Sequence, residues 1–268
     1  MSHEILTVAT RGGAIRTKVY KGGSGPALVW MHGALGISQW EPHLMALSRS
    51  FTVYAPVQPG VGESEGLEQL DDLWDLTLSY LDLFDSLGLG RFALVGHSYG
   101  GMVAAEIAAM APERVRHLVL VGALGLWRDD IAVLDYWTAT PEEQARATYH
   151  DPNGMLARMV AATMPTDEQA RNERIVSMII NTAATIGKFA WPIPDKGLKK
   201  RIHRIKAPTL LIWGRGDGVV PPIYAEEFAA RIPGARVEIL ESAAHLVHLE
   251  RMDRFAPLVS DFCAVGGE

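Results

Sequence analysis

The feature that most constrains this chain is a regular alternation between short apolar runs and longer stretches with helical spacing. A strand covered on both faces of a sheet has no polar face, so it reads as a largely apolar run. The runs are 27–31, 51–55, 92–95, 118–121, 208–213 and 237–240. Helical spacing occurs over 38–47, 70–87, 102–110, 223–231 and 253–263. This alternation predicts a parallel sheet with helices on both faces.

Two further strands are predicted at the start of the chain. Residues 5–9 and 14–20 flank Arg11-Gly12-Gly13, a turn of the kind that joins antiparallel strands. Together with the six apolar runs they make eight strands. We therefore predict an α/β fold with a mostly parallel, twisted, eight-stranded sheet.

The alternation stops between the run at 118–121 and the run at 208–213. Residues 125–200 carry apolar side chains at helical spacing but contain no strand pattern, and they hold Trp127, Trp137 and Trp191. We predict an α/β core formed by 1–124 and 201–268, interrupted by a helical cap at 125–200. The basic run at 199–204 is expected to be a solvated face where the cap rejoins the core.

Composition removes several classes of protein. The formal net charge of −6 lacks the positive excess of a nucleic-acid surface, and the one cysteine, Cys263, excludes an intrachain disulfide. The apolar stretch 118–127 is too short to span a bilayer. The opening residues, 1–4, show neither a basic region nor an apolar one. We expect a cytoplasmic protein with a small-molecule substrate, no nucleic-acid or membrane partner, and a monomeric or homodimeric state.

The most informative segment follows the apolar run at 92–95. It reads Gly96-His97-Ser98-Tyr99-Gly100, a Gly-x-Ser-x-Gly motif placed where a strand ends and a helix begins. A serine on such a sharp turn needs neighbours without side chains, and Gly96 and Gly100 meet that need. The motif predicts that Ser98 is a catalytic nucleophile.

A serine hydroxyl needs a base and an orienting carboxylate, and in this architecture they follow the serine in the order acid, then histidine. Asp217 lies just past the run at 208–213, and His245 just past the run at 237–240. Both are thus expected at the carboxyl edge of the sheet, with Ser98. Two alternatives stand beside this assignment: Asp217 as a cap for the following helix, and His248 as the base.

An oxyanion hole is also required. One donor is expected to be the N–H of Tyr99, the residue after the nucleophile, and the other is expected in the loop after the third strand. That loop reads His32-Gly33-Ala34-Leu35-Gly36, and we predict the N–H of Ala34. His32 and His97 are expected to have structural hydrogen-bonding roles.

The chain as a whole resembles the α/β-hydrolases. The resemblance rests on the His-Gly loop, the elbow at 96–101, residues 59–64 after the fourth strand, the run at 208–214 leading to Asp217, and Ala243-Ala244-His245. It implies that 125–200 roofs the active site. Many members carry an Asp and an Arg or aliphatic residue where this chain has Val57 and Gln58, a difference expected to affect packing more than chemistry.

The resemblance implies a serine hydrolase that cleaves a carboxylic ester of a small, largely apolar substrate through an acyl-enzyme, with no cofactor. A serine at the elbow excludes the relatives that place an aspartate there. C–C bond hydrolases, lactonases and thioesterases use the same triad, so these activities are alternative functions for this chain. C–C hydrolases tend to have an asparagine before the serine and an aromatic residue after the histidine, where this chain has His97 and Leu246. A receptor-like scaffold that only binds its ligand is the non-enzyme alternative.

Neither a nucleotide nor a metal site is predicted. Gly60-Val61-Gly62 begins like a dinucleotide fingerprint, but the third glycine is misplaced and no helix opens there. His245 and His248 are three residues apart without the acidic pattern of a metal helix.

Overall fold

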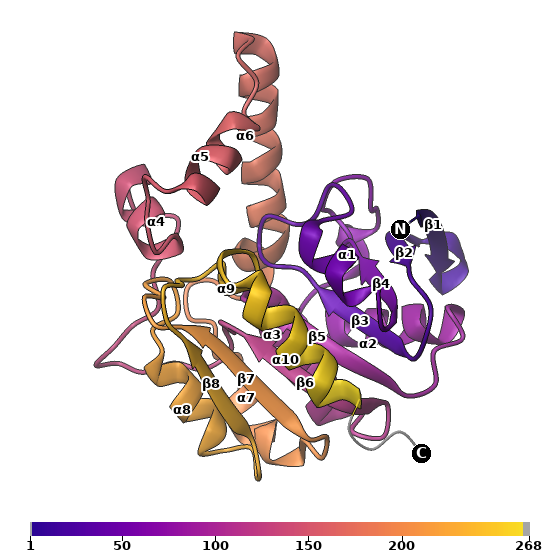
Figure 1. Cartoon of the computed structure of the whole chain (residues 1–268). Helices are drawn as coiled ribbons and strands as arrows, with labels where there is room; N and C mark the ends of the chain where they lie inside the picture. The colour runs from indigo at the N-terminus through magenta and orange to yellow at the C-terminus, as the bar shows by residue number, and fades with distance from the viewer. Residues whose placement is uncertain (1, 265–268) are drawn as a thin grey trace.

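The computed structural model describes residues 2–264, and its centre is one eight-stranded sheet (Figure 1). The strands are β1 (His3–Thr10), β2 (Ile15–Gly22), β3 (Ala27–Met31), β4 (Thr52–Pro56), β5 (Phe92–His97), β6 (Val115–Val121), β7 (Thr209–Gly214) and β8 (Arg236–Leu240). Their order is β1-β2-β4-β3-β5-β6-β7-β8. The β1–β2 and β2–β4 pairs are antiparallel and the other pairs are parallel. The predicted eight-stranded, mostly parallel sheet is confirmed.

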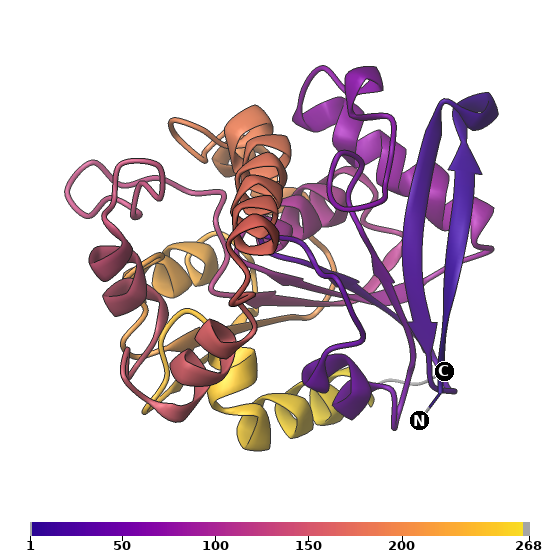
Figure 2. The ribbon, with the colours of Figure 1, turned by 90° about the horizontal axis from the view of Figure 1, so that it is seen from above.

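Helices cover both faces of this sheet (Figure 2). They are α1 (Pro42–Leu47), α2 (Leu73–Ser86), α3 (Tyr99–Met110), α4 (Pro141–Thr148), α5 (Met155–Ala162), α6 (Glu168–Thr182), α7 (Leu198–Arg201), α8 (Ile223–Ala229), α9 (Val247–Glu250) and α10 (Met252–Ala264). Short helical turns are η1 (Arg11–Gly13), η2 (Leu67–Gln69), η3 (Ala183–Gly187) and η4 (Ile202–Arg204). Helices α1 and α10 pack into one apolar cluster, and α2, α3 and α8 pack into the other. The α/β fold is therefore built as predicted.

Three helices begin at different residues from those the periodicity indicates. Helix α1 begins at Pro42 rather than Ser38, since proline fits the first helical turn. Helix α2 begins at Leu73, where the Asp72 carboxylate accepts the N–H groups of the first turn. Helix α3 begins directly after Ser98, although two glycines in its first turn weaken the local helical signal.

Between β6 and β7 the described chain contains helices and turns but no strand, while β6 and β7 pair directly in the sheet. We call residues 125–200 the helical segment. In Figure 1, α6 rises steeply away from the sheet, with α4 and α5 beside it. The division of the chain into a core and a cap stays a prediction.

Apolar side chains lie on the outside of this helical segment. Met155 on α5 is 72% exposed, and Ile179 and Ile180 on α6 are about half exposed. The sheet is different, because the strands β5, β6 and β7 are almost entirely buried.

The basic run at 199–204 is not a uniformly solvated face, so that expectation was wrong in part. The Arg201 guanidinium donates two hydrogen bonds to the Glu106 carboxylate, at 2.9 and 2.6 Å. Glu106 lies on α3 and is only 2% exposed. A carboxylate buried in a core needs such a partner, and the run supplies it.

The single cysteine, Cys263, lies near the end of α10 and is buried against the sheet. Burial raises the pKa of its thiol to about 12. The thiol is therefore protonated at neutral pH.

Within residues 2–264, we find no helix that combines the length and the apolar character needed to cross a bilayer.

Candidate active site

Ser98 lies on the sharp turn between β5 and α3. Its φ is 55°, a left-handed value rare for a residue with a side chain. The turn is held by its backbone: the Ser98 N–H donates to the Val121 carbonyl at 2.8 Å, and the Ser98 carbonyl accepts the N–H of Gly101 at 3.0 Å. Strain of this kind persists only where the surrounding structure imposes it.

The two glycines of the motif are required by close backbone packing. A Cβ on Gly96 would lie 2.4 Å from the carbonyl oxygen of Gly100, and a Cβ on Gly100 would lie 2.3 Å from that of Met31. No side chain fits at either position. The two glycines therefore meet the steric need expected of a sharp turn at Ser98.

Asp217 and His245 meet beyond the ends of β7 and β8. The His245 Nδ1–H donates to the Asp217 Oδ2 at 2.9 Å. The other carboxylate oxygen, Oδ1, accepts the N–H groups of Val219 at 3.0 Å and Val220 at 2.8 Å, which fixes the carboxylate plane. Asp217 does not cap α8, whose N-cap residue is Pro222.

The three predicted triad residues are all buried at the same edge of the sheet. Ser98 is 5% exposed, Asp217 3% and His245 5%. Gly122, at the end of β6, packs beside the pair: a Cβ there would lie 3.0 Å from Asp217 Oδ2 and 3.2 Å from His245 Nδ1. This proximity brings the end of β6 and the two loops into one compact site.

His248, the alternative base, belongs to a row of buried imidazoles instead. Ring centroids lie 4.8 Å apart for His245 and His97, 4.3 Å for His97 and His248, and 4.8 Å for His248 and His43. Burial, reinforced by neighbouring imidazoles, keeps the pKa of His97 and His248 well below the usual histidine value. Within residues 2–264, the carboxylate of Asp217 bonds His245 and not His248.

The predicted structural role of the other two histidines agrees with their contacts. His97 Nε2–H donates to the backbone carbonyl of His245 at 3.0 Å. His32 Nδ1–H donates to the carbonyl of Gly33 at 2.7 Å, and its Nε2 accepts the Gln58 N–H at 3.0 Å. Each ring therefore holds one of the loops that surround Ser98.

The loop from His32 to Gly36 runs beside the serine. A Cβ on Gly33 would lie 3.6 Å from the Cβ of Ser98, so the backbone of this loop passes close to the nucleophile. Tyr99 is the first residue of α3, and its N–H has no acceptor within the helix. In the described part of the chain, the Ala34 N–H makes no backbone hydrogen bond.

The helical segment contacts this site in a way that the sequence did not reveal. At the end of α4, the Thr148 carbonyl accepts the His245 N–H at 3.1 Å, and the Ala147 carbonyl accepts the Gly218 N–H at 3.0 Å. Asn181 at the end of α6 and Thr185 in η3 bond the loop that follows β3. These partners are 146 and 151 residues apart in the chain, and no local pattern marks them.

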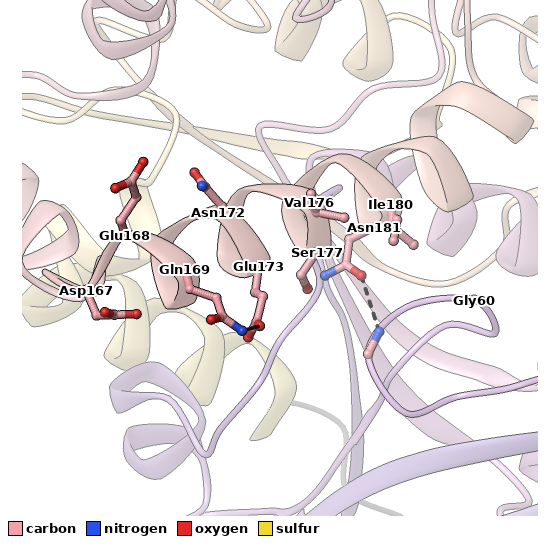
Figure 3. Close-up of a pocket in the computed structure, with 11 residues that line it drawn as sticks. Gly60, Asp167, Glu168, Gln169, Asn172, Glu173, Val176, Ser177, Ile180 and Asn181 are labelled. Carbon is pink, nitrogen blue, oxygen red and sulfur yellow. Dashed lines mark hydrogen bonds between the residues drawn. The ribbon is translucent and has the colours of Figure 1, made fainter.

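A groove lies along α6, outside the three buried residues (Figure 3). Its volume is about 820 Å³, and none of Ser98, Asp217 and His245 lines it. Asp167, Glu168 and Glu173 lie along one part of its wall, and Asn181 faces the Gly60–Gly62 loop at the other end. No lysine or arginine lines it.

No group of three or more His, Cys, Asp or Glu side chains within residues 2–264 is arranged to hold a metal ion.

Comparison with known proteins identifies the class. The family model for the alpha/beta hydrolase fold matches residues 26–251. The chain belongs to this family, since the match covers most of its length and both sides of the helical segment.

Several relatives extend along nearly the whole chain. The chain is 28% identical to a pimeloyl-[acyl-carrier protein] methyl ester esterase of Nitrosomonas europaea, over 87% of this chain and 94% of that one. It is 28% identical to a 2-hydroxy-6-oxononadienedioate/2-hydroxy-6-oxononatrienedioate hydrolase of Burkholderia vietnamiensis, over 96% of this chain and 94% of that one. A polyketide synthase, ThaQ of Burkholderia thailandensis, matches 98% of this chain at 28% identity, but the chain spans only 13% of that protein's length.

Among solved structures, a meta-cleavage product hydrolase of Pseudomonas fluorescens superposes with a TM-score of 0.75. It covers 96% of each chain at 24% sequence identity. This likeness supports the fold. The particular reaction of this chain has to be argued from its own residues.

Proposed function

We propose that this chain is a serine hydrolase that cleaves a carboxylic ester through an acyl-enzyme, with Ser98, His245 and Asp217 as its catalytic triad. The observation that carries the proposal is the His245–Asp217 pair, buried at the same sheet edge as a serine with a φ of 55°. A nucleophile on a strained turn, at the same sheet edge as a base oriented by a carboxylate, is the arrangement that favours acyl transfer.

In this proposal Ser98 Oγ attacks the ester carbonyl while His245 accepts its proton through Nε2. The Asp217 carboxylate holds Nδ1–H and stabilises the imidazolium that forms. The N–H groups of Ala34 and Tyr99 bind the oxyanion, the largest single electrostatic contribution in such reactions. His245 then protonates the leaving alcohol, and water releases the acid by the same steps in reverse.

An ester is favoured over a C–C bond by two residues next to the proposed triad. His97 and Leu246 occupy the two positions where similar C–C hydrolases tend to have an asparagine and an aromatic residue. The dienedioate hydrolase relative keeps C–C bond cleavage as the second candidate.

The first test compares wild type with Ser98→Ala on p-nitrophenyl esters of increasing acyl length. Removal of the nucleophile is expected to lower kcat by about 10⁶-fold, whereas Ser86→Ala, which changes an exposed serine, leaves it unchanged. A fluorophosphonate probe should label wild type and not Ser98→Ala. A wild type that labels but cleaves only a vinylogous diketone would favour the C–C reaction. A wild type that neither labels nor turns over would favour a scaffold that only binds.

Asp217→Asn tests the orienting role. Because Oδ1 accepts two backbone N–H groups, the amide of the asparagine would turn its NH₂ toward His245 Nδ1. The imidazole would then carry its proton on Nε2 and could not accept one from Ser98. We expect kcat to fall about 10⁴-fold at neutral pH with little change in KM. An unchanged kcat would remove Asp217 from the triad.

A further inference from the structure

The loop that carries the Ala34 N–H is held by two side chains of the helical segment. Thr185 Oγ1 lies 2.8 Å from the carbonyl oxygen of Ala34 and also 2.8 Å from that of Asn181, so its one proton is shared between the two acceptors. Asn181 Nδ2–H donates to the carbonyl of Leu35 at 3.0 Å. Thr185 is fully buried and Asn181 is 8% exposed. Two successive carbonyl groups of this loop are therefore fixed from one side.

Asn181 also joins this loop to a second one. Its Oδ1 accepts the N–H of Gly62 at 3.3 Å, and this bond is the dashed line beside the Gly60 label in Figure 3. The Asn181 amide thus spans the loops after β3 and β4. Its side chain cannot move without releasing one of them.

A third contact reaches the same loop through Gln58. The Gln58 Nε2–H donates to the Ala184 carbonyl at 2.8 Å, within the π-helical turn η3 that follows α6. The Gln58 backbone N–H donates to His32 Nε2 at 3.0 Å. The difference from the family pattern at Gln58 therefore links the helical segment to the predicted oxyanion loop.

An oxyanion donor works only when it points at the place where the charge develops. The Ala34 carbonyl and the Ala34 N–H lie in the two peptide planes that meet at the same Cα, so holding the carbonyl fixes one plane and limits how the other can turn relative to the site. We propose that Thr185 and Asn181 are positioning residues that aim the Ala34 N–H at the oxyanion. This inference rests on the proposed serine hydrolase function.

The test pairs Thr185→Val with Thr182→Val. Valine has nearly the shape of threonine, so each change removes a hydroxyl and leaves the packing in place. Within the described residues, Thr182 Oγ1 donates to the Met178 carbonyl within α6, whereas Thr185 in η3 also reaches Ala34. Thr182→Val therefore removes the same kind of hydroxyl at the end of α6, just before η3, where the side chain does not contact the loop.

We expect Thr185→Val to lower kcat by about 10- to 100-fold, with KM within about twofold of wild type. Complete removal of an oxyanion-hole donor typically lowers kcat more, by about 10²–10³-fold. A trifluoromethyl ketone, whose adduct with Ser98 carries an oxyanion, should lose affinity for Thr185→Val by the same factor as the fall in its kcat. The affinity for the product acid should not change. Thr182→Val should match wild type, and Thr185→Ser, which keeps the hydroxyl, should recover kcat.

Asn181→Leu provides a second variant if Thr185→Val does not fold, and it should show the same fall in kcat and in ketone affinity. Wild-type kcat and ketone affinity in a folded Thr185→Val or Asn181→Leu would overturn the proposal. An equal loss in Thr182→Val, or a loss in product-acid affinity, would overturn it too. If the proposed function itself were wrong, the result would differ from these outcomes, because wild type would then show no turnover that depends on Ser98.

Discussion

The sheet edge and the helical segment are held together by different means. At the edge, Ser98 and its glycine neighbours are fixed by backbone contacts so close that no side chain fits. The helical segment instead meets the site through single hydrogen bonds from α4, α6 and η3, and it leaves side chains such as Met155 and Ile179 exposed.

The two kinds of contact differ in how easily they open. A hydrogen bond contributes about 0.5–1.5 kcal/mol, so a few of them can open while the sheet stays folded. Under the proposed function, the sheet edge supplies the groups that react. The helical segment then aligns the loop after β3 and the loops of Asp217 and His245.

The largest expected effect comes from breaking the charged contact where the two regions rejoin. Arg201→Met leaves the Glu106 carboxylate, 2% exposed, without its cation. We expect a loss of about 3–5 kcal/mol in the free energy of unfolding, measured by urea denaturation. Arg215→Ala is the matched control, because its pair with Glu241 is exposed and should cost less than about 1 kcal/mol. Equal costs would mean that the Glu106 pair is not effectively buried.

The buried imidazoles of the core predict an acid-sensitive fold. Burial lowers the pKa of His32, His43, His97 and His248, with His43 at about 3. In the unfolded chain each binds a proton near pH 6.5, so the unfolded state takes up more protons and stability falls as the pH drops below 6.5. Glu41 opposes this trend: burial raises its pKa to about 7, so the folded state gains its proton between pH 7 and 4.5. Four imidazoles outweigh one carboxyl.

His43→Asn sharpens this prediction by removing one titrating group. Between pH 6.5 and 4.5 the dependence of unfolding free energy on pH should decrease by about 1.4 kcal/mol per pH unit. The measurement is urea denaturation at a series of pH values. An unchanged slope would show that His43 is already protonated in the fold.

The smallest effect is expected on the outer face of α6. Ile179 is 53% exposed, so Ile179→Ala should change the unfolding free energy by no more than about 0.5 kcal/mol. Leu120→Ala in β6, at 0% exposed, should cost about 2–5 kcal/mol. If Ile179→Ala costs more than 1 kcal/mol, α6 is covered in solution, and sedimentation velocity would then report a dimer.

Most of the fold could be predicted because its strands are buried on both faces and therefore carry a strong apolar signal. The runs at 27–31 and 118–121 are of this kind, and both became strands of the sheet. The sequence spacing indicates a start at residue 102 for helix α3, which in the structure begins at Tyr99, because Gly100 and Gly101 disfavour a helix locally. They are there because the backbone of Met31 and the side chain of Ala123 approach too closely for any Cβ.

The candidate site was predictable where function depends on position in the chain. Ser98, Asp217 and His245 each follow a strand, and parallel strands bring their carboxyl ends together. Asn181, Thr185 and Thr148 follow no strand, and each contacts a partner far away in the sequence. The Arg201–Glu106 ion pair could not be predicted for the same reason, since a basic run in the sequence does not indicate which carboxylate it contacts.

Because the Cys263 thiol is buried, it should not compete with a cysteine introduced elsewhere for a thiol-reactive probe. With a pKa of about 12, only about one thiol in 10⁵ is ionised at pH 7, so alkylating dyes and spin labels should react slowly with it. A cysteine introduced by Met155→Cys on α5 would sit at an exposed position and would be the one readily modified. A fluorescent or paramagnetic reporter attached there could follow the movement of α5 relative to the sheet during turnover, with no need to remove the native cysteine.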